Sequence, residues 1–280
     1  MTTWTLSGFG DEIDPDPVVQ IAVLQALGAN HLEVRSAWGT NIVELSGDQL
    51  SQLKIILDER GMGVSAIASP IGKVDVAEPI EAELKRLDAA INAAQLLGAG
   101  FIRIFSFYRG EGIAVEAIRD RVIDHLGALA ERAGQAGLVL LHENEKGIYG
   151  DVPARVHDLI TGVGSSALKV AWDNANFVQC GVRPYTDGFD LLLPHLAYLQ
   201  VKDAKADTGQ VTPAGEGDGQ LAETVAGLRD HGFDGFASLE PHLAIAGQLG
   251  GFSGPAAFGR AARAFAFLTH TQGVIFDDGP

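Results

Sequence analysis

Short apolar runs alternate with longer segments of helical periodicity from one end of the chain to the other. The apolar runs have the length of buried strands, which predicts strands over 4–10, 31–36, 63–69, 101–105, 138–143, 169–173, 196–202 and 235–240. The segments between them repeat apolar residues at helical spacing, and several end at glycine. They predict helices over 17–30, 46–61, 80–98, 114–135, 151–162, 186–194, 219–231 and 255–269.

This alternation of strands and helices determines the expected fold class. Near-continuous apolar strands joined by helices indicate parallel pairing, with both faces of the sheet covered. Eight such units without a glycine-rich dinucleotide motif favour an α/β fold of the (β/α)8 TIM-barrel type over a doubly wound sheet. No linker or shift in composition divides the chain, so we expect a single domain over 1–280, with a loosely held tail over 271–280.

Oxygen-bearing side chains close four consecutive predicted strands: Glu143, Asp173, Gln200 and Glu240. In a TIM barrel the functional residues sit at the C-terminal ends of the strands, so these four should meet. Taken singly, each could also be a helix cap or a solvated loop residue. As a set they predict a divalent-metal site. Oxygen donors suit Mg²⁺ or Mn²⁺, and a set without histidine or cysteine makes a dedicated zinc site less favoured.

Other polar residues fall near the same predicted mouth of the barrel. The candidates for substrate binding are Glu12, Arg35, Ser69, Lys73, Arg103, Asn176, Lys202 and Glu216. For Arg35, Arg103 and Lys202, an ion pair with a neighbouring carboxylate is the competing interpretation. Glu216 lies in the sequence GEGDG, which we expect to form a flexible flap. The aromatic residues Trp38, Phe107 and Tyr108 could wall the pocket, although core filling competes for Phe107.

Composition narrows the range of partners and compartments. The formal charge of −16 disfavours nucleic acids and anionic membranes as partners, because both are bound through lysine and arginine. A lone cysteine, Cys180, allows no internal disulfide and fits a reducing cytoplasm. The N-terminus has no signal-peptide pattern, and no apolar stretch has the length of a membrane span. We expect a cytoplasmic protein, with a homodimer or homotetramer left open.

Several motifs resemble one known family. The segments GFGDEI, HLEVRSAWGTNI, AIASPIGK, IRIFSFYRG, LLHENEKGIYGD, WDNANFVQCG, YLQVKDA, GEGDGQ and SLEPHL are similar to the sugar-phosphate isomerase/epimerase family with the xylose isomerase-like TIM barrel. The superfamily includes ketose 3-epimerases, hydroxypyruvate isomerase, inosose dehydratase and an apurinic endonuclease. The resemblance implies a divalent metal held by Glu143, Asp173, Gln200 and Glu240. Many relatives carry histidine in place of Gln200, whereas the hydroxypyruvate isomerase and inosose dehydratase branches include glutamine.

These residues predict proton abstraction next to a carbonyl group. A metal ion chelated by the substrate's carbonyl and hydroxyl oxygens acidifies the C–H bond between them and stabilises the enediolate. Glu143 and Glu240 are the expected catalytic carboxylates, facing each other across the substrate. We therefore expect an isomerase or epimerase of a sugar or sugar-like compound that uses Mn²⁺ or Mg²⁺, with Co²⁺ as a further candidate. The alternatives are an inosose dehydratase-type lyase and a non-catalytic sugar-binding barrel. Gln200 and the acidic charge disfavour DNA repair.

Overall fold

The computed structural model describes residues 2–244 and 251–277, and in this part of the chain eight parallel strands form a ring. They are β1 (Thr2–Gly8), β2 (His31–Val34), β5 (Gly63–Ala68), β6 (Phe101–Ile104), β7 (Val139–Glu143), β8 (Leu168–Asp173), β9 (Leu196–Val201) and β12 (Phe236–Leu239). Neighbours pair in the order β1-β12-β9-β8-β7-β6-β5-β2. A parallel bridge between Phe9 and Glu33 joins β1 to β2 and closes the ring. The TIM-barrel prediction is confirmed.

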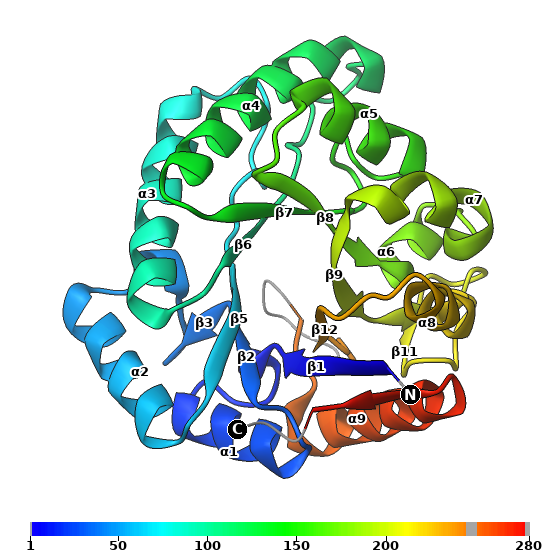
Figure 1. The fold of residues 1–280 in the computed structure, drawn as a ribbon. Helices are drawn as coiled ribbons and strands as arrows, with labels where there is room; N and C mark the ends of the chain where they lie inside the picture. Colours follow the sequence, from blue (N-terminus) through cyan, green and yellow to red (C-terminus); the bar gives the residue numbers. More distant parts are fainter. Residues whose placement is uncertain (1, 245–250, 278–280) are drawn as a thin grey trace.

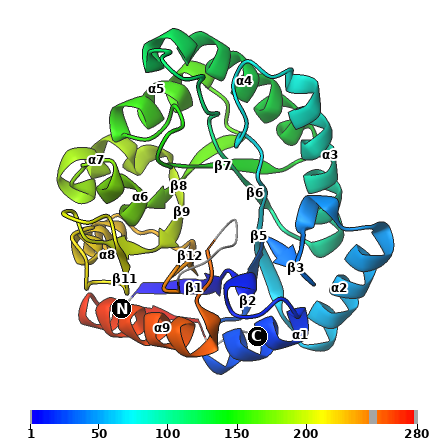
Figure 2. The ribbon, with the colours of Figure 1, turned by 180° about the vertical axis from the view of Figure 1, so that it is seen from behind.

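Helices surround the strands on all sides, as the two opposite views show (Figures 1 and 2). They are α1 (Pro17–Ala26), α2 (Gly47–Glu59), α3 (Ile80–Leu97), α4 (Arg119–Gln135), α5 (Pro153–Val163), α7 (Pro184–Leu192), α8 (Leu221–Asp230) and α9 (Gly254–Thr271). All eight were predicted, with ends that differ by a few residues. A short helix that was not predicted, α6 (Asn174–Gln179), follows β8 directly. None of the helices described here is long and apolar enough to cross a bilayer.

Local sequence explains where several helices begin and end. Ser46 and Gln49 form a reciprocal capping box at the start of α2, which satisfies backbone amides that have no partner within the helix. α3 ends at Gly98 and α5 ends at Gly164, both in the left-handed conformation that glycine adopts without strain. These signals fix the lengths of the helices and so the points at which the chain re-enters the barrel.

Side chains of alternate strand residues fill the interior of the barrel. A small apolar cluster of Ala66, Leu141, Ala171 and Tyr198 joins four different strands. A much larger cluster lies between the strands and the helices and contains most of the buried leucines, isoleucines and valines. Because side chains alternate between the two faces of a strand, Leu141 and Glu143 point the same way. The apolar floor formed by the small cluster therefore lies beneath the polar strand ends.

The C-terminal tail is more ordered than predicted. Val274–Phe276 form a further strand, β13, which pairs in parallel with Thr2–Trp4 of β1. The Phe276 ring packs against Phe265 of α9 at a centroid distance of 5.6 Å. The prediction of a loose tail over 271–280 is wrong for these residues. Their apolar run pairs with the first residues of β1, which precede the part of β1 that pairs with β12. Residues 278–280 lie outside the described part of the chain.

Two antiparallel hairpins extend the C-terminal loops of the barrel. The first joins β3 (Ser36–Ala37) to β4 (Thr40–Asn41), and the second joins β10 (Asp203–Ala204) to β11 (Val211–Thr212). Four short 3-10 helices complete the connections, namely η1 (Gly10–Glu12), η2 (Ile42–Glu44), η3 (Val115–Ile118) and η4 (Leu193–His195). Both hairpins follow strands whose ends carry predicted site residues.

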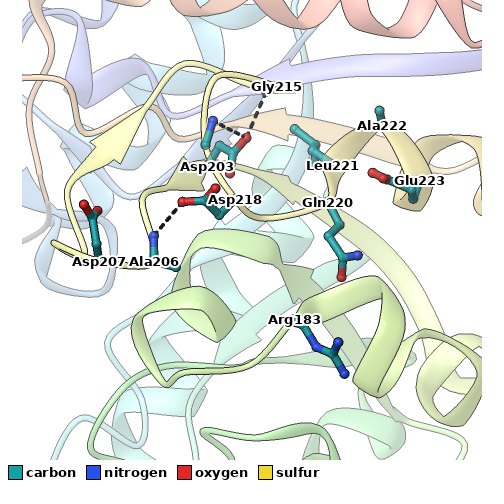
Figure 3. A pocket seen from close by; sticks show the side chains of 11 residues that line it. Arg183, Asp203, Ala206, Asp207, Gly215, Asp218, Gln220, Leu221, Ala222 and Glu223 are labelled. Atoms are coloured by element: carbon teal, nitrogen blue, oxygen red, sulfur yellow. Dashed lines mark hydrogen bonds between the residues drawn. The ribbon is translucent and has the colours of Figure 1, made fainter.

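Asp203 ties down the loop that contains GEGDG (Figure 3). One carboxylate oxygen accepts the amides of Gly215 and Gly217 at 2.9 and 3.1 Å, and the other accepts those of Gly219 and Ala204 at 2.9 and 2.8 Å. A Cβ atom at position 217 would lie 2.2 Å from an Asp203 oxygen, so only glycine fits there. The segment predicted as a flexible flap is thus wrapped around one buried carboxylate. It borders an open pocket of about 580 Å³ beside α8.

We predict that Asp203→Ala lowers the free energy of unfolding by about 2–4 kcal/mol, because four backbone amides lose a charged acceptor. Urea denaturation measures the change. The control is Asp207→Ala, which removes an exposed carboxylate from the same loop (Figure 3) and should change stability by less than about 0.5 kcal/mol. Equal effects of the two substitutions would show that Asp203 does not hold the loop.

Candidate metal centre

A cavity of about 620 Å³ opens at the C-terminal ends of the barrel strands. Eight of the predicted site residues line it: Arg35, Ser69, Lys73, Arg103, Glu143, Asn176, Lys202 and Glu240. They come from strand ends and loops on several sides of the ring. The alternation of side chains along each strand, together with the parallel register, is what brings residues so distant in sequence to one cavity.

Three carboxylates meet beneath this cavity. Glu143, Asp173 and Glu240, which we call the acidic cluster, each offer an oxygen atom within 4.8 Å of the other two. All three side chains are buried. Gln200 pairs with Asp173 in the register of β8 and β9, and with Ser238 in that of β9 and β12. Asp173 and Gln200 are thus cross-strand neighbours, and Glu240 lies two residues beyond Ser238 on the adjoining strand.

Three oxygens of this set make no well-aligned hydrogen bond among the described residues: Glu143 Oε2, Asp173 Oδ2 and Gln200 Oε1. The first lies 3.3 Å from Arg103 Nε and the second 2.9 Å from Lys202 Nζ. The other carboxylate oxygens of Glu143 and Asp173 accept hydrogen bonds. Glu143 Oε1 accepts a hydrogen bond from the side-chain Nδ2 of Asn176 at 3.1 Å, and Asp173 Oδ1 accepts one from the backbone N–H of Asn176 at 2.8 Å. Asp173 thus caps α6 with Oδ1, while Oδ2 faces the ammonium group of Lys202. Buried acceptors without a hydrogen bond are costly, so the set fits a divalent cation that prefers oxygen ligands.

Lys202 lies inside the acidic cluster. Its Nζ atom is 2.9 Å from Asp173 Oδ2 and 2.9 Å from Glu240 Oε2. Burial lowers the pKa of Lys202, but the two carboxylates outweigh this effect and hold the pKa well above its usual value. The side chain is therefore an ammonium group at neutral pH. It can donate hydrogen bonds to a ligand, and it shares two carboxylates with any bound cation.

The carboxylates of Glu143 and Glu240 differ in their surroundings. Burial raises the pKa of Glu143 to about 8, and Arg103 offsets this only in part. Burial also raises the pKa of Asp173, to about 6, against the effect of Lys202. For Glu240, burial is outweighed by Lys202, His242 and Arg35, and the pKa is well below its usual value. The surroundings of Glu143 thus favour the protonated carboxyl group, whereas those of Glu240 favour the carboxylate.

Arg35 and Arg103 form ion pairs with carboxylates, which was the alternative interpretation of both residues. Both also line the cavity. Arg35 contacts Asp11 at 2.8 Å and Glu240 at 3.2 Å. Arg103 lies 3.3 Å from Glu143. These arginines therefore hold Glu240 and Glu143 in place and also border the cavity.

Lys73 and Ser69 occupy the side of the cavity that follows β5. Lys73 pairs with Glu145 at 2.7 Å and lies over the Phe105 ring, 4.2 Å from its centroid. The Ser69 hydroxyl donates to the Arg103 carbonyl at 2.6 Å. Ser69 therefore holds the loop, while Lys73 is a cavity cation paired with a carboxylate.

Two predicted substrate contacts lie elsewhere. Glu12 is buried and accepts from the His242 amide at 2.9 Å and the Ser253 hydroxyl at 2.8 Å, outside the cavity wall. With Glu240 and His242 it forms a second group that could hold a metal. Both of these hydrogen bonds reach its Oε2 atom, and its Oε1 atom lies 3.1 Å from His242 Nε2. Glu216 is exposed in the loop around Asp203 and does not reach the cavity. The sequence placed both residues after the correct strands and could not show how the loops turn.

The cavity wall also contains residues that the sequence analysis did not select: Glu44, Phe105, Glu145 and His242. Strand alternation could have indicated Phe105 and Glu145, which follow Arg103 and Glu143 by two positions. Among the described residues that line the cavity, Trp38, Phe107 and Tyr108 are not found. Phe107 is buried against His125, as its core interpretation predicted.

We predict that Lys202→Met destabilises the protein by about 3–5 kcal/mol without metal, because two buried carboxylates lose their ammonium partner. Mn²⁺ at about 100 times its dissociation constant should restore about 2.7 kcal/mol by binding the native state. Urea denaturation with and without Mn²⁺ tests both statements. Lys205→Met, a change of the same type at a half-buried position nearby, is the control and should be nearly neutral. A Lys202→Met protein that is as stable as wild type, or insensitive to Mn²⁺, contradicts the assignment.

Comparison with known proteins finds relatives in sequence and in fold. One curated relative, 2-epi-5-epi-valiolone 7-phosphate 2-epimerase from Actinoplanes sp. (strain ATCC 31044 / CBS 674.73 / SE50/110), is 27% identical over 239 residues, which are 82% of this chain and 81% of the relative. A D-tagatose 3-epimerase-like protein superposes with a TM-score of 0.78 at 16% identity, covering 96% of this chain and 98% of that chain. At such low identity this likeness concerns the fold alone.

A second solved structure is a xylose isomerase-like TIM barrel protein from Mycobacterium smegmatis in complex with magnesium. It has a TM-score of 0.70 at 16% identity, covering 97% of each chain. The model of one protein family, described as xylose isomerase-like TIM barrel, matches residues 21–265. The match spans most of the barrel and includes Glu143, Asp173, Gln200 and Glu240. The chain belongs to the xylose isomerase-like TIM barrel family.

Proposed function

We propose that this protein is a divalent-metal-dependent isomerase or epimerase of a sugar or sugar-like hydroxy-carbonyl compound, with a role in carbohydrate metabolism. The observation that carries the proposal is the acidic cluster at one polar cavity, where Glu143 Oε2, Asp173 Oδ2 and the neighbouring Gln200 Oε1 make no well-aligned hydrogen bond in the described residues. The epimerase activity named for the curated relative supports the same class of reaction.

The proposed ligands are Glu143, Asp173, Gln200 and Glu240, and the oxygen donor set suits Mn²⁺ or Mg²⁺ best, with Co²⁺ as a further candidate. A divalent ion there would supply Lewis-acid polarisation of substrate oxygens, which acidifies the neighbouring C–H bond. The magnesium held by a relative of the same fold supports this choice of metal.

Glu143 and Glu240 are the proposed catalytic residues. They stand at the ends of β7 and β12, which are separated in the ring by β8 and β9. Both border the cavity, so one carboxylate can remove a proton from one face of a bound substrate while the other returns a proton to the opposite face. Lys202 and Arg35 present N–H donors beside Glu240 and are placed to orient the hydroxyl and carbonyl oxygens of the substrate.

The first experimental test is exchange of a substrate C–H proton with solvent. Ketoses, inososes and hydroxypyruvate are incubated in D₂O with the Mn²⁺-loaded protein, and NMR follows deuterium incorporation. We predict exchange on one compound, its loss with EDTA, and a decrease of about 100-fold or more in Glu143→Gln and Glu240→Gln, because each removes a proton-transfer group. Glu216→Gln, an exposed change outside the cavity, should leave the rate unchanged.

The outcomes separate the competing functions. The structure of the product distinguishes an epimerase, an isomerase and an inosose dehydratase-type lyase. Full exchange in Glu143→Gln or Glu240→Gln, or in the presence of EDTA, contradicts the proposal. Binding of a sugar by the metal-loaded protein without any exchange supports the non-catalytic sugar-binding barrel.

A further inference from the structure

Gln200 differs from the other proposed ligands because its two side-chain ends have opposite chemistry. The amide oxygen can bind a cation, whereas the NH₂ group can only donate hydrogen bonds. Which end faces the acidic cluster therefore decides whether the residue is a ligand. Something in the fold has to fix the orientation of this amide.

Glu33 supplies that constraint from the far side of Gln200. Gln200 Nε2 donates to both carboxylate oxygens of Glu33, at 3.0 and 3.2 Å. Gln200 Oε1 is buried and has no donor in the part of the chain that the structure describes. Burial raises the pKa of Glu33 to about 7. In its ionised form, rotating the amide by half a turn would place the amide oxygen against two carboxylate oxygens, so hydrogen-bond chemistry then selects one orientation.

Glu33 is itself held in position by a buried polar chain. Its carboxylate accepts the Tyr198 hydroxyl at 2.9 Å, and that hydroxyl lies 2.8 Å from the Ser65 hydroxyl. Ser65 in turn is 2.6 Å from Ser7. All of these side chains are buried, and they come from β1, β2, β5 and β9. The acceptor for Gln200 is thus anchored across the interior of the barrel.

We propose that Glu33 is a positioning residue for the metal centre: it holds the amide of Gln200 so that Oε1 is the atom offered to the cation. This inference rests on the metal centre of the proposed function. It also gives a physical reason for glutamine at position 200. A glutamine can satisfy Glu33 with one end and the cation with the other, whereas a carboxylate at 200 would face the carboxylate of Glu33.

The test is a double-mutant cycle on Mn²⁺ affinity, measured by isothermal titration calorimetry on the full chain. Glu33→Met removes the acceptor at similar length and should weaken Mn²⁺ binding by about 10–100-fold, the range for loss of an outer-shell partner. Gln200→Ala removes the ligand. In that background, Glu33→Met should change the affinity by less than about threefold, because the residue it acts through is absent.

Two further variants control for charge and for folding. Glu44→Met removes a carboxylate from the cavity wall and should weaken Mn²⁺ binding by less than about threefold, because Glu44 is exposed and its charge is screened by solvent. Glu33→Gln keeps an oxygen that can accept from Gln200 and an NH₂ group for the Tyr198 hydroxyl. It should stay within about fivefold of wild type, because a hydrogen-bond partner of the ligand is retained. It also provides the comparison if Glu33→Met does not fold.

The results that would overturn the inference are distinct from failure of the proposed function. Wild-type affinity in folded Glu33→Met, or the same loss of affinity with and without Gln200, shows that Glu33 does not act through the amide. A Glu33→Gln protein as weak as Gln200→Ala leads to the same conclusion. If the wild-type protein binds no Mn²⁺, the metal centre itself is wrong and the inference fails with it.

Discussion

The burial of like charges at one point is the constraint on which the rest of the structure depends. Three carboxylates of the acidic cluster lie within 4.8 Å of one another with almost no contact with water. Removing an ionised carboxylate from water costs several kcal/mol, and mutual repulsion adds to that cost, which together raise the pKa of Glu143 to about 8. Lys202, Arg35 and Arg103 offset part of it through contacts of 2.9–3.3 Å. A closed ring of strands and a packed outer layer of helices supply the remaining stability.

The same constraint connects the geometry to the proposed chemistry. The acidic cluster and Gln200 retain oxygens without a well-aligned hydrogen bond, although Lys202 and Arg103 lie 2.9 and 3.3 Å from two of them. A divalent cation would satisfy all of them at once and would bring a Lewis acid to the floor of a polar cavity. The buried polar chain from Ser7 to Glu33 supports Gln200 from below. The site is thus supported from inside the barrel as well as from its loops.

Much of this arrangement could be predicted from the sequence, because it depends on periodicity. Alternation with a period of two identifies the strands, and parallel strands of a closed ring must present Glu143, Asp173, Gln200 and Glu240 at the same end. The loops follow no such rule. Glu12 turns inward to meet His242 and Ser253, while Glu216 is carried outward because its loop wraps around Asp203. The strand over Val274–Phe276 pairs with Thr2–Trp4, the part of β1 that precedes its pairing with β12, and only the folded barrel reveals this position.

Anomalous diffraction from crystals of the wild-type protein grown with Mn²⁺ tests the central claim most directly. The account predicts one strong manganese peak at the C-terminal end of the barrel, coordinated by Glu143 Oε2, Asp173 Oδ2, Gln200 Oε1 and an oxygen of Glu240. A peak held by Glu12, Glu240 and His242, a peak bound through other residues, or no peak at all would contradict it.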